Sequence, residues 1–250
     1  MNDYSNTALV ILGHGSSKHP SSSIPCRLHA DTIRRMQVFK EVHCGFLKET
    51  PLIENCLDHV DAEEVIILPN FLAEGYYTKK VIPEKLGLES LPEAVTYLKP
   101  LGLDDDIQEM IIDLAGRAMG DWKPEETSLV LLGHGSTKSA RSKDTLLEHI
   151  SGLKEKTNFA QITDLWLEEP PFIKDWRDEV ESKQILYIPY LIADGQHGGW
   201  DIPELLGMQR DIYDEYKAHS VDHYSVKLTS ALGKSAKMVD LIIKLATRSS

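Results

Sequence analysis

Cysteine is scarce in this 250-residue sequence, and its positions exclude one class of protein. Cys26, Cys44 and Cys56 are odd in number, contain no C-x-x-C pairing and all lie in the first half. They do not form a disulfide framework, and we expect reduced thiols. No apolar stretch approaches the length of about 18 residues that spans a membrane. The N-terminus also lacks the basic-then-apolar order of a signal peptide, so we expect a cytoplasmic protein.

Basic residues are outnumbered, with 27 Lys and Arg against 39 Asp and Glu, which gives a formal net charge of −12. A nucleic-acid-binding surface normally needs a basic stripe, so this balance argues against that class. Several catalytic motifs are missing as well: G-x-S-x-G, the P-loop, G-x-G-x-x-G and H-E-x-x-H. A hydrolase of the α/β type therefore has no recognisable nucleophile here.

A long internal repeat is present instead. The segment TALVILGHGSSK at 7–18 returns as TSLVLLGHGSTK at 127–138, with nine of twelve positions identical. The same offset of 120 aligns 69–84 with 189–204 without a gap. Solenoid repeats are roughly 20 to 50 residues long, so this period indicates a duplicated domain. We predict two domains, 1–122 and 123–250, joined by a polar stretch that contains Gly and Pro.

Each half alternates short apolar runs with longer amphipathic stretches, the pattern of β-α-β units on a parallel sheet. We predict an α/β fold with two similar three-layer domains, each built on a four-stranded parallel sheet. The expected strands are 9–12, 42–47, 65–68 and 96–98 in the first half, and 129–132, 161–167, 185–188 and 223–227 in the second. The expected helices of the second half are 144–157, 173–181, 204–218 and 231–247.

Two histidines follow strands of the second half. His134 comes directly after the first strand, and His197 lies in the loop after the third. In open α/β sheets ligands bind beyond the carboxyl ends of the strands, where the strand order reverses. A strand order of 2-1-3-4 makes these two strands neighbours and brings the histidines to one edge. For each histidine alone, a structural role in a glycine-rich turn is an equally good interpretation; for the pair, a site is favoured.

Two neutral imidazoles suit Fe, Co, Ni or Zn, and an imidazole with a pKa near about 6.5 can also accept a proton. So few ligands make a weak, open site, which suits a metal that is passed on. Glu168, at the end of the second strand, is the best third group, although a carboxylate that caps a helix or faces water is an equal alternative. Ser136 near His134 is not interpreted as a catalytic Ser-His pair, because no acid partner follows.

These motifs together resemble a known family. Gly-His-Gly-Ser after the first strand, Trp-Leu-Glu at 166–168, and Pro-Tyr-Leu-x-x-x-Gly-x-His-x-x-x-Asp-Ile-Pro at 189–203 are similar to the sirohydrochlorin chelatases of the CbiX type, which are class II chelatases. The resemblance covers most of both halves and implies a chelatase-like fold. It also implies that His134 and His197 bind the metal and help to remove the pyrrole protons, with Glu168 at the family's carboxylate position. No cofactor is expected beyond the divalent metal substrate.

The first half departs from this pattern. Tyr77 stands where the second histidine belongs, Lys48 where Glu168 stands, and Val81 where Asp201 stands, so only His14 remains. The first copy is therefore not expected to insert metal. Because the small family members are single-domain chains that pair, the resemblance implies a monomer that acts as an internal pseudo-dimer.

The implied reaction inserts a metal into sirohydrochlorin, in cobalamin or sirohaem biosynthesis. Cobalt is favoured over iron because the family name attaches to cobalamin synthesis. The tetrapyrrole carries eight carboxylates, so we expect basic or polar groups near the site; the candidates are Ser136, Lys138, Arg141 and His14, with Lys18 and Lys79. A non-catalytic tetrapyrrole- or metal-binding protein that retains the fold is the alternative.

Overall fold

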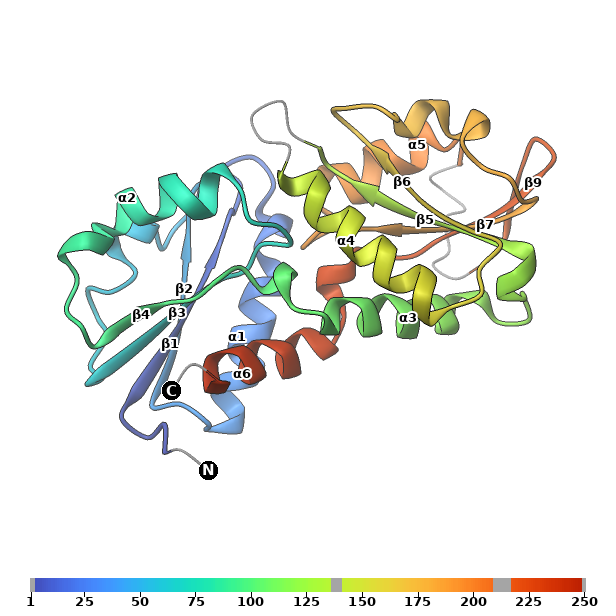
Figure 1. Ribbon diagram of the computed structural model, residues 1–250. Coiled ribbons are helices and arrows are strands. Elements are labelled where there is room, and N and C mark those ends of the chain that lie inside the picture. Colours follow the sequence, from blue (N-terminus) through green and yellow to red (C-terminus); the bar gives the residue numbers. More distant parts are fainter. Residues whose placement is uncertain (1–2, 136–140, 209–216, 249–250) are drawn as a thin grey trace. The chain divides into compact units, whose positions relative to one another are not determined.

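The computed structural model describes residues 3–135, 141–208 and 217–248. The chain forms two compact units, each of which contains one β-sheet (Figure 1). The first unit comprises Met1–Asp104 and Ala236–Ser250, and the second comprises Asp105–Ser235.

The sheet of the first unit is entirely parallel and has the order β2-β1-β3-β4, the arrangement in which the first and third strands are neighbours. All seven residues of its central strand β1 are buried, as expected for a parallel strand covered on both faces. The strands are β1 (Thr7–Gly13), β2 (Glu41–Phe46), β3 (Glu64–Pro69) and β4 (Val95–Tyr97).

Helices cover both faces of this sheet. On one face α1 (Ile24–Met36) packs on β1 and β2 and contacts α6 (Lys237–Arg248), which packs on β3. On the other face Val10, Leu12 and Ile67 form a core with residues of α2 (Ile82–Leu86) and of the short 3-10 turn Ile53–Asn55. The result is the predicted three-layer arrangement.

The second sheet keeps the same order in its four parallel strands but gains a fifth, so that the order is β6-β5-β7-β9-β8. The additional strand β8 runs antiparallel to β9 and joins it through a tight turn in which Asp222 has a φ of 53°. The prediction of four strands in this half was therefore incomplete. The strands are β5 (Thr127–Gly133), β6 (Gln161–Trp166), β7 (Gln184–Pro189), β8 (His219–Val221) and β9 (Tyr224–Leu228).

Residues 209–216 of the helix expected over 204–218 lie outside the described residues. Among the described residues of this segment, helix α5 (Ile202–Leu205) covers only the first two expected positions. It ends before Gly207, whose φ of 78° is a left-handed conformation that glycine adopts without strain and that terminates helices. The segment expected as a helix at 173–181 is a 3-10 helix over Ile173–Asp178.

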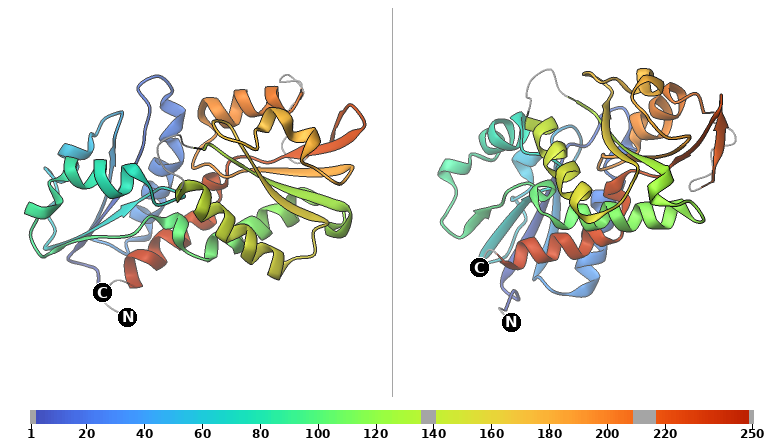
Figure 2. Two further views of the ribbon diagram at one scale, coloured as in Figure 1. Left: turned by 45° about the horizontal axis from the view of Figure 1, so that its top comes forward. Right: turned by 45° about the vertical axis from the view of Figure 1, so that its right-hand side comes forward.

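The longer helices of the second unit are α3 (Asp106–Met119) and α4 (Arg141–Lys156), which pack together and against β7 and β6 respectively. Both views in Figure 2 show α3 beside α4. The opposite face of the sheet is covered by Ile173, Trp176 and α5. This unit also has three layers.

The two units differ from the domains expected from the repeat, 1–122 and 123–250. Helix α3, the last helix of the first repeat, belongs to the second unit, and α6, the last helix of the second repeat, belongs to the first unit. In each repeat a glycine precedes this last helix at a place where the backbone of another segment leaves no room for a side chain. A Cβ atom on Gly102 would lie 2.0 Å from the Leu72 carbonyl oxygen, and one on Gly233 would lie 2.3 Å from that of Ile192. Leu72 and Ile192 are 120 residues apart, so the same close backbone contact occurs in both repeats just before the last helix.

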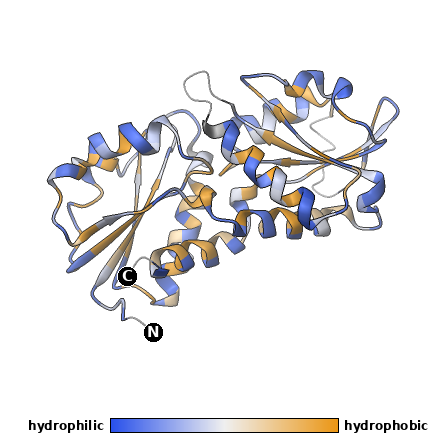
Figure 3. Cartoon of the chain, viewed as in Figure 1, coloured by the Kyte–Doolittle hydropathy of each residue, from blue (hydrophilic) through white to orange (hydrophobic). Residues whose placement is uncertain are grey.

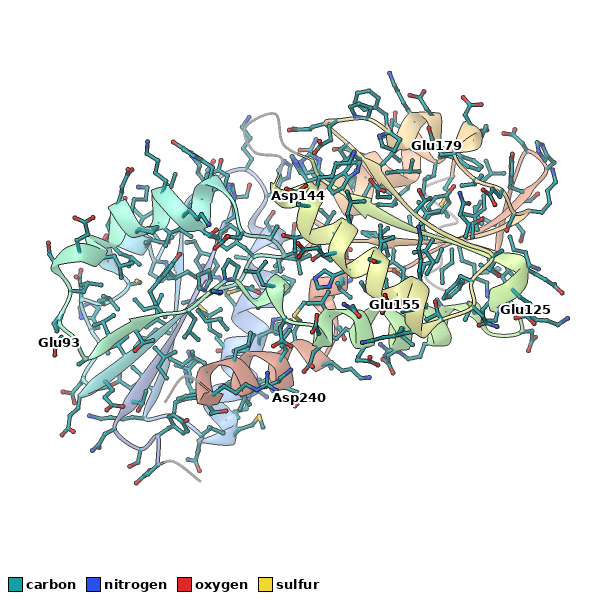
Figure 4. The ribbon with its side chains drawn as sticks, in the orientation of Figure 1. Glu93, Glu125, Asp144, Glu155, Glu179 and Asp240 are labelled. Atoms are coloured by element: carbon teal, nitrogen blue, oxygen red, sulfur yellow. The ribbon has the colours of Figure 1, made fainter. Side chains whose placement is uncertain are left out.

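Hydrophobic residues are concentrated on the strands and on one side of each longer helix (Figure 3). Within the described part of the chain, every helix is too short or too polar to cross a lipid bilayer. Exposed acidic residues occur on both units, and six of them are labelled in Figure 4: Glu93, Glu125, Asp144, Glu155, Glu179 and Asp240.

Candidate active site

The structure brings His134 and His197 together at the carboxyl edge of the second sheet. His134 follows β5, and His197 begins a π-helical turn, His197–Asp201, after β7. Because β5 and β7 are neighbouring parallel strands, their carboxyl ends meet at this edge. The predicted convergence of the two residues is confirmed.

The two imidazole rings have centroids 4.7 Å apart and planes at 84°. Imidazole nitrogens bind divalent metals at about 2.0–2.1 Å, which places two rings on one metal roughly 4.5–5.5 Å apart by centroid. The observed separation lies within this range. Both side chains are accessible, with 40% of His134 and 44% of His197 exposed.

The hydrogen bonds of the two rings select the same nitrogen. His134 Nδ1 lies 3.1 Å from the Gly135 carbonyl oxygen, and His197 Nδ1 lies 2.8 Å from Asp201 Oδ2. A carbonyl or carboxylate oxygen only accepts, so Nδ1–H donates in both rings, and in the neutral form of each ring Nε2 carries the lone pair. Such an outer contact fixes the tautomer and orients an imidazole for a metal. Asp201 therefore supports His197 in the way that metal-binding histidines are usually supported.

The loop that carries His197 is itself anchored. Asp194 accepts hydrogen bonds from the Ala231 backbone N–H and from Lys234 Nζ, both at 2.7 Å. Its carbonyl oxygen also accepts from the Gly198 N–H at 2.6 Å. Sequence reasoning missed Asp194, although Glu74 occupies the aligned place 120 residues earlier and the shared acidic residue was a usable signal.

Glu168 is near this pair but not bonded to it. Its backbone N–H donates to the His134 carbonyl oxygen at 3.0 Å, and its Oε2 lies 3.8 Å from His134 Nδ1, beyond hydrogen-bond distance. About half of the side chain is exposed, at 51%. Within the part of the chain that the structure describes, no three His, Cys, Asp or Glu side chains are grouped closely enough to hold a metal.

The other predicted residues lie outside the described residues, on α4 or in the first unit. Ser136 and Lys138 lie outside the described residues, and Arg141 is the first residue of α4. His14 and Lys18 belong to the first unit, as does Lys79, which forms an ion pair with a glutamate at 2.7 Å.

The first unit has a similar arrangement with different chemistry. His14 follows β1, its Nδ1 lies 2.8 Å from the Gly15 carbonyl oxygen, and its ring meets the Tyr77 ring at 5.2 Å and 86°. The Lys48 backbone N–H donates to the His14 carbonyl oxygen at 3.0 Å, as Glu168 does to His134. Phenol is a poor ligand for a divalent metal at neutral pH, so this edge lacks the second ligand.

A carboxylate secures the histidine loop of the first unit. Glu49 accepts hydrogen bonds from the Ser16 backbone N–H at 3.0 Å, from Ser23 Oγ at 2.5 Å and from Arg27 Nη2 at 2.8 Å. Burial tends to raise the pKa of Glu49, but these hydrogen bonds outweigh it and hold the pKa below its usual range. Sequence reasoning missed this residue too, although an identical glutamate 120 residues later marks the position.

Glu169 occupies the corresponding place in the second unit, where a Cβ atom on Gly135 would lie 3.0 Å from its Oε1. The neighbouring position behaves differently, because Lys48 in one repeat corresponds to Glu168 in the other. Glutamate is thus common to both repeats beside the histidine loop, as Glu49 and Glu169. Lys48 and Glu168 give the carboxyl edges of the two sheets opposite charges at this position.

Comparison with known proteins gives a family match over both repeats. The model of the CbiX family matches residues 8–118 and 128–249. The "Probable sirohydrochlorin cobaltochelatase" of Halobacterium salinarum is 30% identical over 96% of this chain and 90% of its own.

Two solved structures share the fold. A multi-domain protein of Deinococcus radiodurans with structural similarity to chelatases has a TM-score of 0.80 at 22% identity, over 98% of this chain and 56% of that longer one. The sirohydrochlorin chelatase SirB from Bacillus subtilis subspecies spizizenii, in complex with cobalt, has a TM-score of 0.72 at 17% identity, over 98% of this chain and 95% of its own. At these identities the likeness concerns the fold alone.

Proposed function

The chain belongs to the CbiX family, and from this premise we propose that it is a sirohydrochlorin chelatase, which inserts a divalent metal into the tetrapyrrole. The observation that carries the proposal is the imidazole pair. Both rings commit Nδ1 to an oxygen acceptor, so both Nε2 atoms are left with a lone pair at one accessible edge. His134 and His197 hold the incoming metal.

Insertion exchanges two protons for one metal ion, so two pyrrole N–H groups must lose their protons. Glu168 is the proposed acceptor for one of them, because its exposed carboxylate lies beside His134 without being bonded to it. When the metal moves to the macrocycle, the Nε2 atoms of both histidines are freed, and one of them accepts the second proton. No redox step and no nucleotide enter this balance.

Co²⁺ is the proposed metal, with Fe²⁺ as the second choice. Imidazole suits both ions, and selectivity between them depends on supply as much as on ligands. Two neutral ligands also bind weakly enough to release the metal again. We further propose that the chain is a monomer, because both repeats lie in one polypeptide, and that it acts in the cytoplasm.

The test is an insertion assay. Purified protein, metal-free sirohydrochlorin and Co²⁺ are mixed, and the absorption change of the macrocycle is followed. We expect acceleration over the spontaneous rate, loss of at least about 100-fold in His134→Ala and His197→Ala, and most of the activity retained in His14→Ala. Binding without acceleration would favour the non-catalytic alternative, and the reverse ranking would move the site to the first unit.

A further inference from the structure

The carboxyl edge of the first sheet has kept its shape but reversed its charge. Lys48 and Glu168 make the same backbone contact to the histidine before them, at 3.0 Å in both units. Their side chains therefore leave the backbone from equivalent places. At the position of Asp201 the first repeat has Val81. Two carboxylates of the second unit are thus replaced by one ammonium group and one apolar side chain.

Lys48 is available to a ligand. The residue is exposed, and within the described part of the chain its ammonium group forms no ion pair. The adjacent carboxylate does not neutralise it, because Glu49 is occupied by Ser16, Ser23 and Arg27.

Tyr77 adds a second donor beside the same histidine. Its ring meets the His14 ring edge-on at 5.2 Å, and the centroid of the Tyr76 ring lies 5.8 Å from that of Tyr77. These contacts hold the phenol in place, while its hydroxyl has no hydrogen-bond partner among the described residues. Lys48 and Tyr77 each contact His14, one through its backbone and the other through its ring, and their ammonium and phenol O–H groups are donors of the kind that bind a carboxylate.

We propose that His14, Lys48 and Tyr77 form a carboxylate-binding site in the first unit, which takes an acetate or propionate side chain of a tetrapyrrole. The carboxylate chemistry follows from these residues, and the identity of the ligand rests on the proposed function. Lys48 Nζ and the Tyr77 hydroxyl donate to the carboxylate oxygens, and His14 positions the Tyr77 ring.

The test separates this site from the metal site. Binding of metal-free sirohydrochlorin is titrated by fluorescence in the full-length His134→Ala/His197→Ala protein, alone and combined with Lys48→Met or Tyr77→Phe. The matched control is Lys40→Met, which removes the same charge from an exposed lysine just before β2, at the amino edge of the same sheet. We expect Lys48→Met to weaken binding about fivefold, Tyr77→Phe about threefold and Lys40→Met by less than about twofold.

Ionic strength and an esterified ligand give independent readouts. The affinity of the His134→Ala/His197→Ala protein should fall more steeply with salt than that of its Lys48→Met derivative. The octamethyl ester of sirohydrochlorin should bind both equally. Equal affinities of the Lys48→Met and Lys40→Met proteins for the free acid, or no binding at all, would overturn the site.

Failure of the site and failure of the proposed function give different results. If wild-type protein inserts metal but Lys48→Met binds the tetrapyrrole like the control, the site is wrong and the function stands. If binding depends on Lys48 while wild-type protein does not accelerate insertion, the site stands and the function is wrong.

Discussion

At the scale of single residues, the two repeats differ less in their histidines than in what supports them. His14 and His134 both donate Nδ1–H to the next residue's carbonyl oxygen. The second unit alone adds a second imidazole, whose own Nδ1 is held by Asp201. A histidine after the first strand is therefore common to both units and does not by itself distinguish them.

Asp201 provides a direct test of that support. Asp201→Asn keeps an acceptor oxygen but removes the charge, so His197 should bind metal more weakly, by about 10- to 100-fold in metal affinity or activity. The measurement is the Co²⁺ dependence of the insertion rate. Asp240→Asn, which changes an exposed carboxylate on α6, is the control and should behave like wild type. Equal rates for the two variants would show that Asp201 does not act through His197.

His29 predicts a pH dependence of stability. The residue is 6% exposed, its Nδ1 has no hydrogen-bond partner among the described residues, and burial lowers its pKa from 6.5 to about 4. Above pH 6.5 neither state binds the proton. Between pH 6.5 and 4 the unfolded state binds it and the folded state does not, so the free energy of unfolding falls as the pH falls.

The expected contribution of His29 is a loss of about 2–3 kcal/mol between pH 7.5 and 4.5. Urea unfolding at several pH values measures it, and His29→Gln, which does not titrate, isolates it from the carboxylates. The two proteins should lose stability by different amounts over this range. Parallel curves would mean that His29 titrates normally in the folded state.

At the scale of elements, the site depends on strand ends and on the short structures that follow them. The apolar runs predicted the parallel strands, because a buried parallel strand leaves a continuous apolar signal. They did not specify which strands are neighbours. The π-helical turn at His197 and the early end of α5 at Gly207 were not predicted. Both depend on local backbone conformation and on contacts with distant segments, and hydrophobic spacing does not encode these.

One such distant contact joins β9 to the end of α3. Lys227 is 8% exposed, and its Nζ donates to the carbonyl oxygens of Ala118 and Met119, both at 2.9 Å, and lies 4.7 Å from the centre of the Trp122 ring. Burial lowers the pKa of Lys227. The ammonium group satisfies the last carbonyls of the helix, which have no partner within it.

Lys227→Met should therefore destabilise the protein by about 1–3 kcal/mol, since it leaves these carbonyl oxygens without a donor. Urea unfolding at pH 7 measures the change. Lys154→Met, on an exposed position of α4, should change stability by less than about 0.5 kcal/mol. If the two variants were equally stable, water would have replaced the ammonium group at no cost.

At the scale of the whole molecule, the repeat in the sequence and the compact units in space have different boundaries. The offset of 120 residues predicted the duplication and aligned both histidine loops. It did not predict that α3 packs on α4 and that α6 packs on α1. Both helices are amphipathic, and an apolar face does not specify which of two similar sheets it covers.

Fragments of the chain test these boundaries. Residues 105–235 form a continuous segment that contains the whole second unit, so this fragment should fold cooperatively on its own. Residues 123–250 lack α3, whose buried face includes Ile107, Met110 and Ile111, and they carry α6 without its sheet. Circular dichroism and urea unfolding should show a cooperative transition for the first fragment and none for the second. A cooperative transition for 123–250 would show that the repeat is the folding unit.

The place of α6 in the first unit also affects how the protein folds during synthesis. The strands of the first sheet are complete once Tyr97 has emerged from the ribosome, but α6 begins at Lys237. At roughly 5–20 residues per second, the intervening segment Asp105–Ser235 takes about 7–26 s to translate. During that interval one face of the first sheet lacks its second helix, while every element of the second unit has been made before α6 appears. The half that is translated first is therefore the half that completes its fold last.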